Sequence, residues 1–244
     1  MLERSVITID VRNRQLGRPV LLLNGMGAPA ASWDVFRPEL DDRMTITYES
    51  TDAATSGTHP LTMVTIARVA VAVLDRAGVE AADVVGYSYG GAVAQQLALD
   101  APDRIRRLVL VATSCGVGSV PGQFGALPRF LIELGDPWRS GTPSLFWEAL
   151  AFSTWTSVPF LGSIQHPTLV IAGRRDPIVP LANARLLARR IPRARLAEHE
   201  GSHDLFAAPH ATTTARVIRR FLDETFDEPG GADSGPPPAA LADR

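Results

Sequence analysis

Apolar and polar positions along the chain follow two repeating patterns. Short apolar runs bounded by turn-forming residues predict buried strands, and longer stretches with apolar residues at helical spacing predict the helices between them. Strands that alternate with helices favour a mostly parallel sheet with helices on both faces, which is an α/β fold. The predicted strands are residues 5–11, 19–24, 44–49, 83–87, 105–112, 168–172 and 195–199, and the predicted helices are residues 33–40, 61–77, 90–99, 181–190 and 213–226.

Two segments depart from this alternation. Residues 116–161 are rich in Gly, Pro and large apolar side chains without a clean period, so we interpret them as a cap inserted into the domain. From residue 228 onward the sequence EPGGADSGPPPAALADR offers almost no core-forming side chains, which predicts a disordered tail. The pattern therefore predicts one domain over residues 1–227, with its cap at about 116–161, and a tail over residues 228–244.

Composition narrows the classes of function. The chain has 244 residues and a formal net charge of −2, which gives no electrostatic footprint for nucleic acid or an anionic membrane surface. No apolar run approaches the roughly 18 residues that a membrane span requires. The first residues lack the apolar core of a signal peptide, so we expect a cytoplasmic protein.

Two residue types exclude further chemistry. Cys115 is the single cysteine, which excludes an intrachain disulfide and a cysteine-based metal cluster. All 24 basic residues are Arg, so Schiff-base catalysis, a Ser-Lys dyad and a lysine-containing phosphate loop are excluded as well.

The strongest local motif is GYSYGG at residues 86–91, where the predicted strand 83–87 meets the predicted helix 90–99. A nucleophilic serine on such a tight turn needs small residues two positions away on either side, and the helix that follows directs its first N–H groups toward the same point. The motif therefore predicts Ser88 as a nucleophile. The alternative interpretation is a Gly-rich turn that only allows the strand and the helix to pack closely.

A serine hydroxyl becomes a good nucleophile only when a base takes its proton. In hydrolases with this kind of turn, the acid and then the histidine follow the serine along the chain. His203 lies in the loop after the last predicted strand and is the predicted base, whereas the other histidines suit structural, surface or loop roles. The histidines of the chain are His59, His166, His199, His203 and His210.

The acid is expected after the preceding strand. Asp176 follows the strand at residues 168–172 directly, and Pro177 stiffens the turn that would hold its carboxylate toward the imidazole. An Asp that only shapes the turn before a proline is the alternative. The turn after the neighbouring strand carries Thr113 and Ser114 and no carboxylate, so Asp176 has little competition.

A serine hydrolase also needs an oxyanion hole. The run NGMG at residues 24–27 follows the second predicted strand, and its glycines free the backbone to direct an N–H group inward. The predicted donors are the backbone N–H groups of Met26 and Tyr89. By itself the run could be a plain Gly-rich loop, and only its place relative to Ser88 favours the catalytic interpretation.

With these residues, the chain resembles the α/β-hydrolase superfamily, and more narrowly the intracellular poly(3-hydroxyalkanoate) depolymerases, which cleave storage polyesters of medium-chain hydroxyacids. The resemblance implies a mostly parallel sheet with a short cap, and serine ester hydrolysis with no metal and no organic cofactor. It rests on LLLNGMGA at 21–28, on VVGYSYGGAVAQQLALDAPDRIRRLVLVAT at 84–113, on WTSVPFLGSIQHPTLVIAGRRDPIVPLANARLLARRIPRA at 155–194, and on GSH at 201–203.

Two features differ from the depolymerase pattern. After the predicted strand 44–49 the superfamily usually has an Asp and a Gly-rich loop that ends in Ser, whereas residues 50–57 read STDAATSG. The cap is also shorter, which implies a different acyl pocket. These differences keep open a non-hydrolytic enzyme on the same fold, such as a lyase, a cyclase or a perhydrolase. A binding protein without activity is disfavoured, since it has no use for Ser88, Asp176 and His203 together.

Large aromatic side chains crowd the cap, and one more lies near the predicted oxyanion loop. They either pack the cap on the domain or line a pocket for a small-molecule or oligomeric ester with an apolar acyl part. The residues predicted to bind substrate are Trp33, Phe130, Trp138, Trp147 and Trp155.

Overall fold

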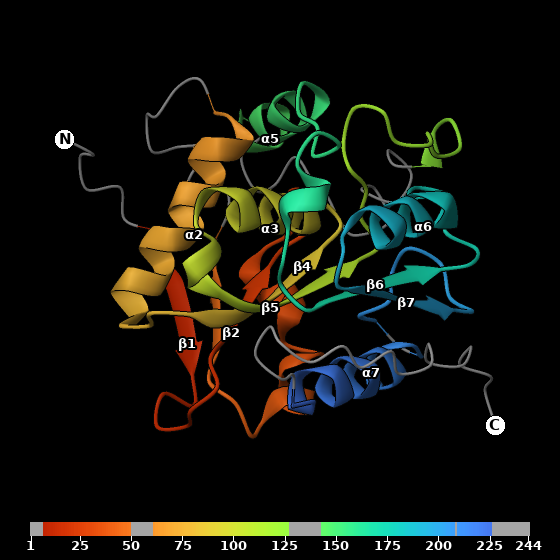
Figure 1. The fold of residues 1–244 in the computed structure, drawn as a ribbon. Helices are drawn as coiled ribbons and strands as arrows, with labels where there is room; N and C mark the ends of the chain where they lie inside the picture. Colours follow the sequence, from red (N-terminus) through yellow and green to blue (C-terminus); the bar gives the residue numbers. More distant parts are fainter. Residues whose placement is uncertain (1–6, 50–60, 127–142, 208, 226–244) are drawn as a thin grey trace.

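The computed structural model describes residues 7–49, 61–126, 143–207 and 209–225 (Figure 1). These residues form a seven-stranded sheet in the order β1-β3-β2-β4-β5-β6-β7, in which β1 pairs with β3 antiparallel and all other neighbours pair parallel. The strands are β1 (Ile9–Arg12), β2 (Val20–Leu23), β3 (Thr45–Tyr48), β4 (Ala82–Tyr87), β5 (Ile105–Val111), β6 (Thr168–Gly173) and β7 (Ala194–His199). The predicted α/β architecture is confirmed.

Helices cover both faces of this sheet (Figure 1). Figure 1 shows α7 below the sheet and α2, α3 and α6 above it, with α5 above α3 and farther from the sheet. In the described ranges, none of the helices combines the length and the apolar character that crossing a membrane requires. The helices are α2 (Met63–Ala77), α3 (Tyr89–Asp100), α5 (Pro143–Ser153), α6 (Leu181–Arg190) and α7 (Ala211–Asp223), with short 3-10 helices at Ala30–Trp33, Arg37–Leu40, Pro102–Arg104 and Leu161–Ser163.

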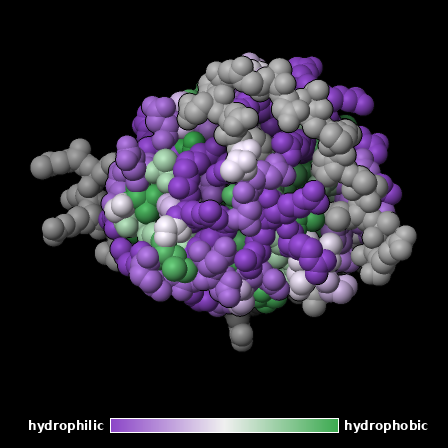
Figure 2. Space-filling model, turned by 60° about the horizontal axis from the view of Figure 1, so that its bottom comes forward, coloured by the Kyte–Doolittle hydropathy of each residue, from purple (hydrophilic) through white to green (hydrophobic). Residues whose placement is uncertain are grey.

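The core consists of two layers, one on each face of the sheet, and side-chain alternation along β2 shows how they arise. Leu21 and Leu23 belong to the layer under α2, α3 and α6, whereas Val20 and Leu22 belong to the layer under α7. Successive strand side chains point to opposite faces, so a strand that is covered on both sides carries apolar side chains on both, as β2 does. Figure 2 shows that the face carrying α7 is largely hydrophilic outside, with apolar side chains only in scattered patches.

Most predicted elements match the observed ones to within a few residues, but the helix predicted over residues 33–40 is wrong. The chain there forms two 3-10 helices, Ala30–Trp33 and Arg37–Leu40, and Pro38 lies in the first turn of the second. Proline has no N–H to donate to the preceding turn, so one continuous helix cannot run through this segment. The predicted tail, residues 228–244, lies outside the described residues, and the domain division stays a prediction.

Candidate active site

Ser88 occupies the turn between β4 and α3 in a strained backbone conformation. Its φ is 51° and its ψ is −114°, a region that side chains other than glycine rarely adopt. Glycine on both sides makes the turn possible. A Cβ at Gly86 would lie 2.4 Å from the carbonyl oxygen of Gly90, and a Cβ at Gly90 would lie 2.1 Å from that of Leu23. The backbone N–H of Ser88 donates to Val111 on β5 at 2.8 Å, which anchors the turn to the sheet.

His203 lies in the loop after β7 and reaches Ser88 across the edge of the sheet. Its Nε2 is 3.1 Å from the Ser88 Oγ. The imidazole is almost fully buried, and the ring of Tyr87 lies against it with the two centroids 5.4 Å apart. The Tyr87 hydroxyl also donates to the backbone carbonyl of His203 at 3.3 Å. Tyr87 therefore holds His203 in two ways, by a ring contact with the imidazole and by a hydrogen bond to the backbone.

Asp176 completes the hydrogen-bonded chain from the turn after β6. Its Oδ2 is 2.7 Å from the His203 Nδ1. Its Oδ1 accepts the backbone N–H groups of Ile178 and Val179 at 2.8 and 2.9 Å. Two N–H donors on one carboxylate oxygen fix its direction. The three residues predicted as a catalytic triad are therefore linked by hydrogen bonds, and this arrangement can move a proton from Ser88 to His203.

Other histidines in the described ranges have contacts elsewhere. His199 accepts the Gly201 N–H through its Nδ1 at 2.9 Å, and its ring centroid lies 4.8 Å from that of His210. His166 Nε2 lies 2.9 Å from the Pro102 carbonyl oxygen, at the start of β6. His59 lies outside the described residues.

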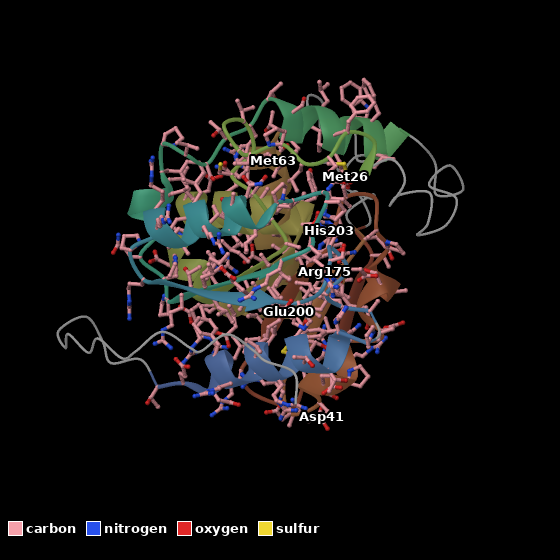
Figure 3. The ribbon with its side chains drawn as sticks, turned by 90° about the vertical axis from the view of Figure 1, so that its right-hand side faces the viewer. Met26, Asp41, Met63, Arg175, Glu200 and His203 are labelled. Carbon is pink, nitrogen blue, oxygen red and sulfur yellow. The ribbon has the colours of Figure 1, made fainter. Side chains whose placement is uncertain are left out.

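The predicted oxyanion loop follows β2. Figure 3 shows Met26 directly beneath α5 and above His203. The side chain of Asn24 closes the loop, because its Nδ2 donates to the Ala28 carbonyl at 3.0 Å and its Oδ1 accepts the Trp33 Nε1 hydrogen. Met26 and Tyr89 both line the pocket that contains Ser88, which is where the predicted N–H donors have to lie.

This pocket has a volume of about 280 Å³ and a mixed wall. Met26, Phe152 and Val179 are among its apolar lining residues, and Thr113 and Ser114 add hydroxyl groups. Thr113 is buried, and its Oγ1 has no hydrogen-bond partner within the part of the chain that the structure describes. No local pattern in the sequence marks Thr113 as a pocket residue, because its position depends on β5 ending beside the serine turn.

Three of the predicted substrate-binding aromatics, Trp33, Trp147 and Trp155, are not among the described residues that line this pocket. Trp33 packs edge-on against Phe206 in the core layer under α7, with ring centroids 4.7 Å apart. Trp155 is buried and donates its Nε1 hydrogen to Gln96 at 2.7 Å, and Trp147 packs against its neighbour Phe146 at 5.3 Å. In the structure these three tryptophans pack against other side chains, and a substrate contact at any of them stays a prediction. Phe152 is the described cap aromatic in the pocket wall, while Phe130 and Trp138 lie outside the described residues.

Burial controls the ionisation of the two tyrosines that flank Ser88. It raises the pKa of the Tyr87 hydroxyl well above its usual value, and the Asp204 and Asp176 carboxylates raise it further. Burial likewise raises the pKa of Tyr89, with a further contribution from the carboxylate of Glu148 on α5. Both hydroxyls therefore stay neutral near pH 7, when they can donate hydrogen bonds.

Comparisons with known proteins show which families and folds the chain resembles. A family profile described as the alpha/beta hydrolase fold matches residues 18–131 and 134–207. The chain is 34% identical over 244 aligned residues to a poly(3-hydroxyalkanoate) depolymerase of Ectopseudomonas oleovorans, with 84% of each chain covered. It is 27% identical to a 2-hydroxymuconate semialdehyde hydrolase of Pseudomonas sp. strain CF600, with 91% of this chain and 94% of that protein covered. The crystal structure of the enol-lactonase from Burkholderia xenovorans LB400 shares the fold, with a TM-score of 0.76 and 21% identity over 89% of this chain and 96% of that chain.

Proposed function

The chain belongs to the α/β-hydrolase fold family, and from this premise we propose that it is a serine hydrolase that cleaves a carboxylic ester through an acyl-enzyme. The observation that carries the proposal is the chain of hydrogen bonds from Ser88 through His203 to Asp176. The His203 Nε2 lies 3.1 Å from the Ser88 Oγ, and its Nδ1 lies 2.7 Å from the Asp176 Oδ2. A folded chain has no structural need for a strained serine in contact with a buried, carboxylate-bound imidazole.

In this mechanism His203 Nε2 takes the hydroxyl proton as the Ser88 Oγ attacks the ester carbonyl carbon. The tetrahedral oxyanion accepts hydrogen bonds from the backbone N–H groups of Met26 and Tyr89. When the ester C–O bond breaks, His203 returns the proton to the departing alcohol. Water then attacks the acyl-enzyme by the same route and releases the acid. Asp176 keeps the imidazole in the required tautomer and stabilises its positive charge.

The pocket supports a short acyl group or one end of an oligomer. Its volume of about 280 Å³ lies just below the usual range for small-molecule sites, about 300–1,000 Å³. Apolar contacts from Met26, Phe152 and Val179 suit an alkyl chain, whereas the buried Thr113 hydroxyl suits an oxygen substituent on that chain. We therefore propose an ester, thioester or lactone whose acyl part is mainly apolar and carries an oxygen substituent. The name of the depolymerase relative is consistent with such an acyl part.

The first test is hydrolysis of a p-nitrophenyl ester series from acetate to dodecanoate by wild type and Ser88→Ala. We expect the wild type to turn over the shorter esters and the variant to lose about 10³-fold or more in kcat, because removal of the nucleophile leaves only residual catalysis. Ser163→Ala, at an exposed serine remote from the pocket, is the matched control and should keep wild-type activity.

Two outcomes would contradict the proposal. Equal rates of wild type and Ser88→Ala would remove Ser88 as the nucleophile. A folded wild type that turns over no ester would instead favour the non-hydrolytic alternative, a lyase, cyclase or perhydrolase on the same fold.

A further inference from the structure

A buried carboxylate that the triad does not use lies between the cap and the oxyanion loop. Glu148 is on α5 and is only 2% exposed. Its Oε2 accepts the backbone N–H of Gly27 at 2.8 Å, across 121 residues of sequence. A carboxylate is costly to remove from water, so its position over this loop needs a reason beyond packing.

The oxyanion loop is held from three sides, and Glu148 provides the anchor from the cap. On the side of the domain core, the Asn24 side chain donates to the Ala28 carbonyl. At the end of the loop, the Ala30 N–H donates to the Glu49 carboxylate at 3.1 Å. From above, α5 also covers Gly27 with Leu145, whose Cδ1 would lie 3.1 Å from a Cβ at that glycine.

The bond to Glu148 selects one orientation of the peptide between Met26 and Gly27. A peptide unit is planar and trans, so an N–H that points to Glu148 forces the Met26 carbonyl to point the opposite way. Gly27 has a φ of +66° and no side chain, so its own preferences would permit other orientations. A flipped peptide would bring the Met26 carbonyl oxygen against the negative carboxylate. The charge therefore disfavours the flipped form.

The surroundings of Glu148 connect it to the serine turn. Glu148, Tyr89 and Tyr48 are all buried. Burial raises the pKa of both tyrosines, and the Glu148 carboxylate raises it further. Tyr89 follows Ser88 directly and supplies the second N–H that we assign to the oxyanion. Its ring also packs against Phe152, the cap aromatic that lines the pocket, with centroids 6.2 Å apart. The same helix thus contacts both sides of the proposed oxyanion hole.

We infer that Glu148 is a positioning residue, which shapes the oxyanion hole by fixing the orientation of the Met26–Gly27 peptide. The position of α5 on the domain and the ability of the hole to stabilise the oxyanion are therefore coupled. This inference rests on the proposed function. The Gly27 N–H is occupied by Glu148. The Met26 N–H, which belongs to the adjoining Gly25–Met26 peptide, is the donor that we assign to the substrate oxygen. The interaction acts on the transition state, where the negative charge develops, more than on the bound ester.

The test compares Glu148→Leu, Glu148→Asp and Glu148→Gln with wild type on the best p-nitrophenyl ester. Leucine removes the acceptor and aspartate retracts it by one methylene. Both should lower kcat by about 10²-fold with KM changed less than about threefold, because loss of one oxyanion donor has this size of effect. Glutamine keeps an acceptor oxygen and should restore kcat to within about tenfold of wild type. Leu150→Ala, on the exposed side of α5, should match wild type.

A transition-state analogue gives a second readout. Butylboronic acid forms a tetrahedral, negatively charged adduct on a serine, and its inhibition constant should rise in parallel with the loss of kcat. The inference would be overturned if Glu148→Leu and Glu148→Asp both kept the kcat and the boronate affinity of wild type. A loss confined to KM, or a Gln variant as impaired as the Leu variant, would also overturn it. If Glu148→Leu fails to fold, the Asp and Gln variants decide.

Amide exchange at Gly27 separates this inference from the proposed function. The Gly27 N–H should exchange about tenfold or more faster in Glu148→Leu than in wild type, whether or not the protein hydrolyses esters. Unchanged exchange would overturn the inference even in an active esterase. An inactive wild type with the expected exchange difference would overturn the ester hydrolysis alone.

Discussion

The Nε2 atom of His203 lies 3.1 Å from the hydroxyl oxygen of Ser88, although 115 residues separate the two in the sequence. The contact exists because β4 and β7 are parallel strands of one sheet, so the loops that follow them meet at the same edge. Asp176 follows β6, the neighbour of β7, and reaches the far side of the same imidazole. The candidate site is thus a property of strand order.

Asp176→Asn should abolish most activity while the fold survives. The amide oxygen can still accept the Ile178 and Val179 N–H groups that now bond to Oδ1. The amide nitrogen cannot accept the His203 Nδ1 hydrogen, so the imidazole loses its required tautomer. We expect kcat to fall by about 10³–10⁴-fold. Steady-state kinetics measure the loss of kcat, and a thermal unfolding curve shows whether the fold survives. An Asn variant with kcat within tenfold of wild type would contradict the role of Asp176.

Gly90→Ala should destabilise the serine turn strongly. Its new Cβ would lie 2.1 Å from the Leu23 carbonyl oxygen and 2.6 Å from that of Asn24, both of which are backbone atoms that cannot turn aside. We expect a loss of about 3 kcal/mol or more in the free energy of unfolding, measured by urea titration. The matched control is Gly162→Ala, where no atom lies within 4 Å of the new Cβ. Similar stability of the two variants would show that the turn has more room than the structure gives it.

Thr113→Val should change substrate preference more than overall activity. Valine has nearly the shape of threonine, so packing against Gly91 is kept, but the buried hydroxyl in the pocket wall is lost. We expect the wild type to favour the p-nitrophenyl ester of 3-hydroxybutyrate over that of butyrate, and the variant to lose about tenfold of this preference. The ratio of the two kcat/KM values is the measurement. An unchanged ratio would remove Thr113 as a substrate contact.

Trp33→Leu should weaken the fold and leave substrate preference unchanged. Trp33 packs against Phe36 and Phe206 in the core layer under α7, and it donates a hydrogen bond to Asn24. Shrinking a buried aromatic and removing its hydrogen bond costs about 2–4 kcal/mol of stability. Denaturant unfolding gives this value, and the ester chain-length profile gives the other half of the prediction. A shifted profile in a stable variant would restore Trp33 as a pocket residue.

The sequence by itself determined the α/β class and the identity of the three residues that hydrogen bonds link at the site, Ser88, Asp176 and His203. Parallel strands that are buried on both faces consist mainly of apolar residues, so VLLL of β2 and TLVIAG of β6 are recognisable without a structure. The serine turn is equally local, because the conformation of Ser88 demands glycine at fixed positions on either side. Asp176 and His203 could be named because each follows a strand whose place in the alternation is clear.

Only the tertiary structure decided which side chains face the substrate pocket. Trp33 and Phe152 are both large aromatics near predicted functional segments, yet Trp33 packs in the core layer under α7 and Phe152 lines the pocket. Glu148 is one carboxylate among many in the sequence, and its bond to Gly27 exists only because α5 lies over the oxyanion loop. The local pattern of apolar residues determines which face of a helix or strand is buried. Contacts between elements that are distant in the chain depend on packing that no single segment encodes.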